Sequence, residues 1–141
     1  MEDIDRRSAM ALGLTVAAAT PLMALATPAA AAMYGPEDGT EVMPGIRQVE
    51  LGEFPATFGG YAKAKLNDYI YAPGVVEPSS AMMNDMICQI IEGELSTKLD
   101  DQDWTTSKTG HLFTCAKGAL EENKNETDAA AVMRVIDLLP A

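Results

Sequence analysis

The amino-acid sequence predicts an all-β protein folded as a sandwich or a barrel. Short runs of β-forming residues are separated by clusters of turn-forming residues about every 8 to 12 residues, a spacing typical of antiparallel β-proteins. No segment shows a sustained helical period in its apolar residues. The chain has 141 residues, which suits one compact core once an amino-terminal segment is set aside, and is too short for two domains.

The first 32 residues have the pattern of an export signal peptide. Two adjacent arginines, Arg6 and Arg7, precede a long uncharged stretch that ends in the small residues a signal peptidase reads. The arginine pair and the weakly hydrophobic core resemble a twin-arginine signal. A membrane-spanning helix is the alternative, but Pro21 and Pro28 interrupt the stretch. We expect residues 1–32 to be removed, which leaves a periplasmic or secreted protein with no stable membrane span.

The chain is acidic, with a formal net charge of −11 at pH 7. Residues 1–32 carry a net charge of −1, so the mature chain would carry −10. This charge argues against nucleic acids and anionic membranes as partners. Both cysteines, Cys88 and Cys115, lie in the exported part, where oxidising conditions permit a disulfide.

Residues 33–45 are predicted to form an N-terminal arm, and residues 46–141 a β-barrel domain. The arm is rich in glycine, proline and acidic residues and has no periodic pattern. In the domain, Tyr61–Gly74 alternates small or apolar residues with lysines, which is typical of a strand with one solvent-exposed face. Met86–Leu95 is almost continuously apolar up to Gly93, as in a strand buried on both faces or a barrel strand that turns a corner.

The second half of the domain continues the strand pattern. Leu99–Trp104 is predicted to be an acidic hairpin tip, and His111–Gly118 a strand that ends in a glycine turn. Ala129–Leu139 could form a helix because of its alanines. Its three β-branched residues favour a final strand instead.

Two sets of spacings in the domain resemble the motifs of the cupins, which are small double-sheet jelly-roll barrels. The first cupin motif is a glycine, five residues, His-x-His, three or four residues, a glutamate, six residues and a glycine. Gly74 and Gly93 match the two glycines. Ser80, Met82 and Met86 stand where the motif has its two histidines and its glutamate.

The second cupin motif is a glycine, five residues, Pro-x-Gly, two residues, a histidine, three residues and an asparagine. Gly110, Gly118 and Asn125 match it. Ala116 replaces the proline and Glu121 replaces the histidine. The resemblance extends from about residue 45 to the carboxyl terminus and implies a cupin-type double-stranded β-helix, a jelly-roll barrel.

Cupins usually bind iron, manganese, nickel, copper or zinc through three histidines and a glutamate. The residues at these positions here are Ser80, Met82, Met86 and Glu121. A site of histidines and carboxylates for a hard or borderline divalent metal is therefore not expected. His111 is the only histidine, and its place next to Gly110 indicates a solvent-exposed turn residue rather than a ligand.

The resemblance also brings sulfur-containing residues together. In the cupin barrel, the strand that begins at Met86 lies antiparallel to the strand that ends at Cys115. Strand alternation places Cys88 on the same interior face as Met86. We therefore expect a pocket of six residues, all but the serine being candidate metal ligands: Ser80, Met82, Met86, Cys88, Cys115 and Glu121.

Glu121 begins a polar run that could also form a solvent-exposed loop. Its motif position points inward in the family, where burial would raise the pKa of its carboxyl group or require a hydrogen-bond donor. The candidate donors are Asn84, Tyr69 and Tyr71. A buried glutamate in such a cup also suits a small cationic or hydrogen-bond-donating ligand.

Three interpretations of the pocket stay open. The methionines could fill the core while the cysteines are buried thiols or a cross-strand disulfide. Thioether and thiolate groups could instead bind a soft metal, copper(I) above all. The third interpretation is catalysis, with Glu121 as general base or Cys88 as nucleophile, although no histidine is available to activate the thiol.

We expect an exported cupin-like protein with a substituted metal site, which binds a small molecule or a soft metal ion such as copper. The alternative is a metal-dependent cupin enzyme, an oxygenase or an isomerase, with an unusual ligand set. Cupins often pair through their outer sheet or N-terminal strand, so a homodimer is a further expectation from the resemblance.

Overall fold

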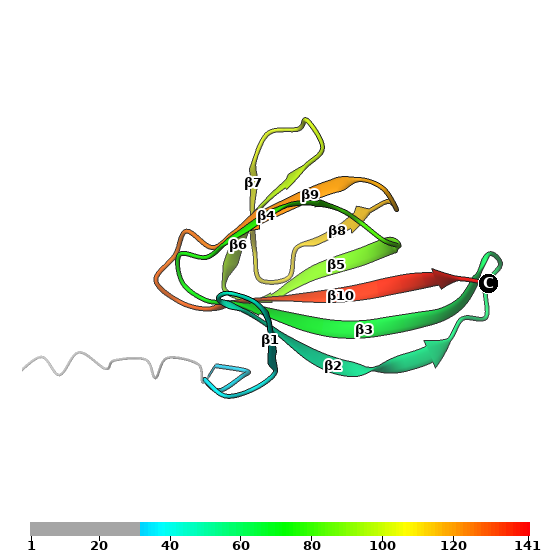
Figure 1. Cartoon of the computed structure of the whole chain (residues 1–141), viewed down its shortest axis with the longest axis horizontal. Coiled ribbons are helices and arrows are strands. Elements are labelled where there is room, and N and C mark those ends of the chain that lie inside the picture. The colour runs from blue at the N-terminus through cyan, green and yellow to red at the C-terminus, as the bar shows by residue number, and fades with distance from the viewer. Residues whose placement is uncertain (1–31) are drawn as a thin grey trace, which may run out of the picture. The chain divides into compact units, whose positions relative to one another are not determined.

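The computed structural model describes residues 32–141, and within them the chain forms ten β-strands and no helix (Figure 1). The strands are β1 (Thr40–Met43), β2 (Ile46–Pro55), β3 (Tyr61–Tyr71), β4 (Val76–Ala81), β5 (Asp85–Glu92), β6 (Glu94–Leu99), β7 (Thr105–Lys108), β8 (Leu112–Cys115), β9 (Leu120–Lys124) and β10 (Ala131–Pro140). None of the described residues forms a helix long and apolar enough to cross a membrane. Apart from its last residue, the predicted export signal lies outside the described residues.

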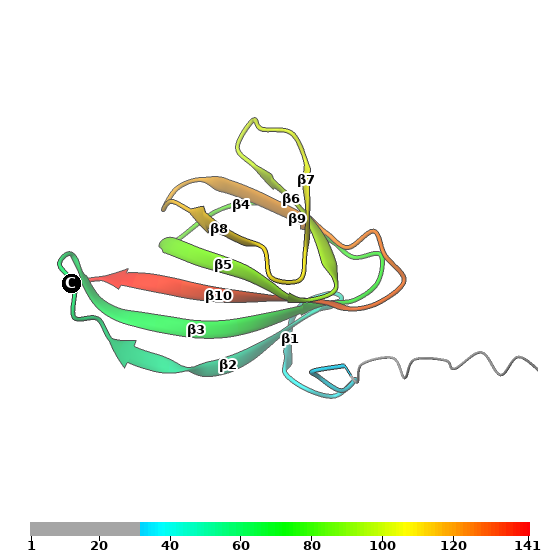
Figure 2. The same ribbon diagram turned by 180° about the vertical axis from the view of Figure 1, so that it is seen from behind.

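The strands build two facing antiparallel sheets, seen from opposite sides in Figure 1 and Figure 2. The larger sheet has six strands in the order β1-β2-β3-β10-β5-β8, and the smaller has four in the order β4-β9-β6-β7. From β3 onward the chain passes back and forth between the sheets. This two-sheet jelly roll confirms the predicted fold class.

The predicted strand Met86–Leu95 is two strands, because the chain turns a corner at Gly93. Before the corner, β5 pairs with β8 and β10, and after it β6 pairs with β7 and β9. Gly93 has a φ of 73°. A Cβ atom there would lie 2.7 Å from the carbonyl oxygen of Ala130. Of the two interpretations, the barrel strand that turns a corner is therefore the correct one.

The final strand is β10, which lies between β3 and β5 in the larger sheet. The helical alternative for Ala129–Leu139 is thereby excluded. Met133 and Val135 of this strand join the core. The acidic hairpin tip at Leu99–Trp104 is also confirmed, since these residues connect the paired strands β6 and β7.

A short strand, β1, occupies part of the segment 33–45 that the composition indicated to be an arm without a regular pattern. It pairs with β2. Ahead of it, the Tyr34 hydroxyl donates a hydrogen bond to Oδ2 of Asp68 (2.6 Å). Arg134 binds the same carboxylate through Nε and Nη2, at 2.8 and 2.9 Å. Because Asp68 is fully buried, the start of the arm is held to the larger sheet.

The core between the sheets is mainly apolar, but buried polar side chains lie on β6, β7 and β9 of the smaller sheet. Its buried apolar side chains are Ile46, Tyr71, Met86, Cys88, Ile90, Leu95, Cys115, Ala131, Met133 and Val135. Along β9 the usual alternation is reversed, because Leu120 is exposed whereas Glu121, Asn123 and the following Asn125 are buried. Polar side chains in this position need internal hydrogen-bond partners.

Replacing Gly93 by alanine is expected to lower the free energy of unfolding by about 3 kcal/mol, since the strain of a positive φ adds to the contact with Ala130. Gly74→Ala is the matched control. Gly74 has a φ of 74° and nothing within 4 Å of the added Cβ, so its loss should be about 1 kcal/mol. Denaturant unfolding measures both, and equal losses would contradict the role of the Ala130 contact.

Candidate functional site

A cavity of about 150 Å³ opens between the two sheets. Its lining residues come from β3, β4, β5, β9 and β10 and from the β4–β5 turn: Tyr69, Tyr71, Glu77, Met82, Met86, Glu121, Met133, Val135 and Asp137. Three of the six residues expected at the pocket, Met82, Met86 and Glu121, are among them. Ser80 is exposed and does not line the cavity.

The two cysteines lie beside this cavity on neighbouring strands. Met86 pairs with Cys115 across β5 and β8, and Cys88 pairs with Phe113. Both cysteines are buried, and both point into the barrel, as expected. The two sulfur atoms and a carboxylate oxygen of Glu121 all lie within 4.8 Å of one another. Cys88, Cys115 and Glu121 are called the thiol–carboxyl cluster below.

Glu121 connects the cluster to the cavity. Glu121 lies in strand β9 rather than in a loop, and it is only 4% exposed. Its Oε2 accepts a hydrogen bond from Sγ of Cys115 (2.9 Å), and its Oε1 accepts one from Nδ2 of Asn123 (2.7 Å). The carboxyl group therefore faces a thiol on one side and an amide on the other.

The donors to Glu121 are not the expected ones. The Tyr71 hydroxyl donates to Oε2 of Glu77 instead (2.8 Å). Within residues 32–141, the side chains that donate to Glu121 are those of Cys115 and Asn123, not Tyr69 or Asn84. Asn123 was missed, although the sequence contains a signal for it. In a strand, a residue two positions after Glu121 must share its face.

A second carboxylate, Glu77, belongs to the same network. Nδ2 of Asn123 donates to Oε2 of Glu77 (2.9 Å) as well as to Glu121. Oδ1 of Asn123 accepts a hydrogen bond from Oγ1 of Thr97 (2.7 Å). One side-chain amide thus bridges two carboxyl groups and ties both to β6. Glu77 lies opposite Asn123 in the β4–β9 pairing.

The pKa values of the Glu121 carboxyl and the Cys115 thiol are both raised. Burial raises the pKa of Glu121 and the charge of Glu77 adds to this, against the opposing hydrogen bonds that the carboxyl accepts. The pKa of the Cys115 thiol is raised too, first by its hydrogen bond with Cys88 and then by burial. A metal ion that binds here would have to displace thiol protons.

The pairing of β5 and β8 disfavours a disulfide between the two cysteines, which are free in the structure. They form a diagonal pair rather than a directly opposed one. Diagonal neighbours in a sheet have Cα atoms roughly 7 to 8 Å apart, whereas disulfides need about 4.4 to 6.8 Å. The geometry therefore favours two reduced thiols.

Thiol titration of unfolded, unreduced protein is accordingly expected to find two free thiols per chain. Prior reduction should leave this count unchanged, which makes the reduced sample the control. A count of zero before reduction would show that the strands move far enough to close the bond. A dimer linked through one cysteine would contradict the burial of both.

A second prediction concerns pH. The carboxyl of Glu121 has a pKa above its ordinary value of 4.5, so the stabilisation from its acid form is complete below that pH. This stabilisation is lost as the pH rises through the folded-state pKa. Glu121→Gln removes the titration, so the stability of this variant relative to wild type should increase with pH across that range.

Denaturant unfolding at a series of pH values measures this difference. Glu122→Gln is the matched control, because Glu122 is the adjacent and only partly buried glutamate of the same strand. The Asp137 carboxyl, whose pKa is also raised by burial, is present in all three proteins and cancels. Parallel curves for wild type and Glu121→Gln would contradict the shift.

Comparisons with known proteins agree on the fold. No protein-family model matches the chain, and no curated protein sequence is similar to it. Among solved structures, an RmlC-like cupin family protein with a double-stranded β-helix fold from Methanocaldococcus jannaschii is 18% identical, with a TM-score of 0.51. That match covers 55% of this chain and 71% of the other.

Two further structures cover more of the chain. KdgF from Halomonas sp. is 15% identical over 72% of this chain and 86% of its own, with a TM-score of 0.59. An RmlC-like cupin from Shewanella frigidimarina is 14% identical over 77% of this chain and 89% of its own, with a TM-score of 0.57. The predicted cupin-type double-stranded β-helix is therefore confirmed as the fold.

Proposed function

We propose that this protein is an exported cupin-fold binding protein that holds a soft metal ion, copper(I) being the best match, at the thiol–carboxyl cluster. The observation that carries the proposal is the convergence of three buried potential ligand atoms, two sulfurs and one oxygen, within 4.8 Å of one another. Thiolate and thioether ligands select copper(I) over calcium, magnesium and manganese.

The usual cupin ligand set does not fit these residues. Three histidines and a glutamate hold the metal in that family, whereas Ser80, Met82, Met86 and Glu121 stand at the corresponding positions. The one histidine, His111, lines a different cavity. Iron, manganese or nickel coordinated through imidazole therefore finds no support in this chain.

The neighbourhood of the cluster suits a soft monovalent ion. Met86 lies directly opposite Cys115 in the β5–β8 pairing and is buried on the same inner face, so its thioether adds a third soft donor. Two thiolates around copper(I) leave a net charge of −1. Burial raises the pKa of Glu121, so a cation held beside its carboxylate would offset part of the cost of keeping that charge in the core.

Titration of the reduced protein with copper(I) under anaerobic conditions, against the chromogenic chelator bathocuproine disulfonate, tests the proposal. Wild type should take up one equivalent. Cys88→Ser and Cys115→Ser should each weaken binding roughly 100-fold or more, and Met86→Leu less, because thiolates are the stronger ligands. Met83→Leu is the matched control, since Met83 is 80% exposed and should bind copper as wild type does.

Two results would contradict this function. Uptake that is unchanged in both cysteine variants would place the copper elsewhere. Stoichiometric zinc binding without copper(I) uptake would show that the site prefers a borderline metal ion to a soft one. The export part of the proposal is tested separately by the amino-terminal sequence of protein recovered from the exported fraction, which should begin near Met33.

The second candidate is a metal-dependent enzyme of the cupin type with an unusual ligand set. The observation in its favour is the cavity of about 150 Å³ beside the cluster, which leaves room for a small molecule. Stoichiometric iron, manganese or nickel in protein purified from its native host would favour the enzyme over the binding protein.

A further inference from the structure

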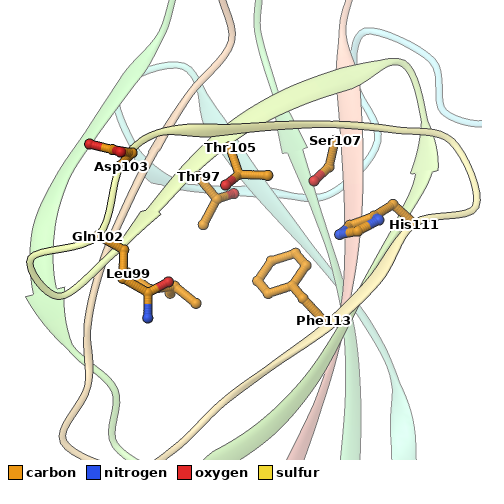
Figure 3. Close-up of a pocket in the computed structure, with 8 residues that line it drawn as sticks. All are labelled: Thr97, Leu99, Gln102, Asp103, Thr105, Ser107, His111 and Phe113. Carbon is orange, nitrogen blue, oxygen red and sulfur yellow. The ribbon is translucent and has the colours of Figure 1, made fainter.

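A second cavity, of about 200 Å³, lies between the β6–β7 hairpin and β8 (Figure 3). Its lining residues are Thr97, Leu99, Gln102, Asp103, Thr105, Ser107, His111 and Phe113. It shares no lining residue with the cavity beside the thiol–carboxyl cluster. None of the substituted cupin-motif positions contributes to it either. It is called the hairpin cavity below.

One wall of the hairpin cavity is a row of hydroxyl groups. Thr97 pairs with Thr105 across β6 and β7, and Ser107 follows Thr105 by two positions, so it lies on the same face. Figure 3 shows these three side chains along one side of the cavity, with Phe113 facing them. The inner face of this hairpin thus carries hydroxyls where a barrel would ordinarily bury apolar groups.

Ser107 is the informative member of this row. It is only 4% exposed, yet it lines the cavity. No fully buried side-chain oxygen in residues 32–141 lacks a hydrogen-bond partner, so the Ser107 hydroxyl, which bonds to no other side chain there, is open to the cavity rather than sealed in the core. The fold does not use this hydroxyl, so it is available to a molecule that enters the cavity.

The opposite wall is aromatic. The rings of His111 and Phe113 are stacked, with centroids 6.2 Å apart and planes inclined by 27°. Leu99 extends this surface, while Gln102 and Asp103 add an amide and a carboxylate from the hairpin tip. The cavity therefore offers an apolar surface for C–H groups on one side and hydrogen-bonding groups around it.

The charges of the lining make anionic ligands poor matches. No lysine or arginine lines the hairpin cavity, so a phosphate or a carboxylate would meet Asp103 without a compensating cation. Hydroxyl groups, in contrast, donate and accept hydrogen bonds with equal ease and match the lining hydroxyls and the amide. The volume is below the range of about 300 to 1,000 Å³ that drug-sized ligands occupy.

We propose that the hairpin cavity binds a neutral polyhydroxylated molecule of about monosaccharide size. Its hydroxyls bond to Ser107, Thr105 and the hairpin tip, and its C–H face packs on Phe113 and His111. This site is independent of the soft-metal proposal, because the two cavities have separate linings. The protein then has a place for an organic ligand as well as one for an ion.

NMR titration of the isotope-labelled full chain with D-glucose, D-galactose and myo-inositol, one at a time, tests the proposal. At least one polyol should produce saturable shifts at Thr105, Ser107, His111 and Phe113, with a Kd of about 1 mM. Cyclohexanecarboxylate, an anion of similar size, should produce none. Absence of saturable shifts with all three polyols would overturn the proposal, as would preferential binding of the anion.

Variants locate the ligand. Ser107→Ala should weaken binding roughly fivefold, the worth of one hydrogen bond, and leave thermal stability unchanged because the hydroxyl has no partner in the described chain. His111→Ala, at an exposed turn, should weaken binding by removing the stacked surface. Ser79→Ala is the matched control, because Ser79 is an exposed serine of β4 outside the cavity, and this variant should bind as wild type does. Affinity that survives both cavity variants would overturn the assignment.

Discussion

The side-chain amide of Asn123 is the interaction on which the interior of the barrel depends. Its nitrogen donates to Glu77 and Glu121 and its oxygen accepts from Thr97, so both polar atoms of the amide are hydrogen-bonded. Two carboxyl groups held this close would repel each other without a shared donor. The amide thereby lets β4, β9 and β6 meet through polar rather than apolar side chains.

The candidate metal site is divided between the two sheets. The cysteines belong to β5 and β8 of the larger sheet, and Glu121 belongs to β9 of the smaller one. The hydrogen bond between Cys115 and Glu121 therefore crosses the core. Because each sheet fixes its own ligands by strand pairing, the separation of the sheets determines the size of the site.

The sequence alone predicts the turns of this fold better than its polar interior. A corner at Gly93 was one of the two interpretations of Met86–Leu95. Strand alternation placed Cys88 inside, whereas an inward Cys115 was a further assumption. Ser80 illustrates the limit: residue counting puts it at a ligand position, yet a register shift lies between Glu77 and Ser80 in the β4–β9 pairing, and Ser80 is exposed. A β-bulge changes which side chains face inward. Counting residues along one strand does not reveal the bulge.

The identity of the donor to Glu121 was hidden for the same reason. Tyr69, Tyr71 and Asn84 are reasonable donors by chemistry, but the choice depends on which strands become neighbours and in what register. Strand β1 escaped prediction because four residues of mixed composition, set between glycines, carry too weak a pattern. In both cases the outcome is determined by pairing between strands that are distant in the sequence, which the local sequence does not show.

The two hydrogen bonds to Glu121 differ in whether donor and acceptor can exchange roles. The Asn123 amide can only donate through its nitrogen, so its two bonds to carboxyl oxygens keep one direction. A thiol can donate or accept, so the bond between Cys115 and Glu121 runs from sulfur to oxygen when the carboxyl is ionised and from oxygen to sulfur when it is protonated. When Glu121 gains a proton, the thiol hydrogen of Cys115 therefore has to turn away from the carboxyl group, while Asn123 and Thr97 on the other side keep their orientations.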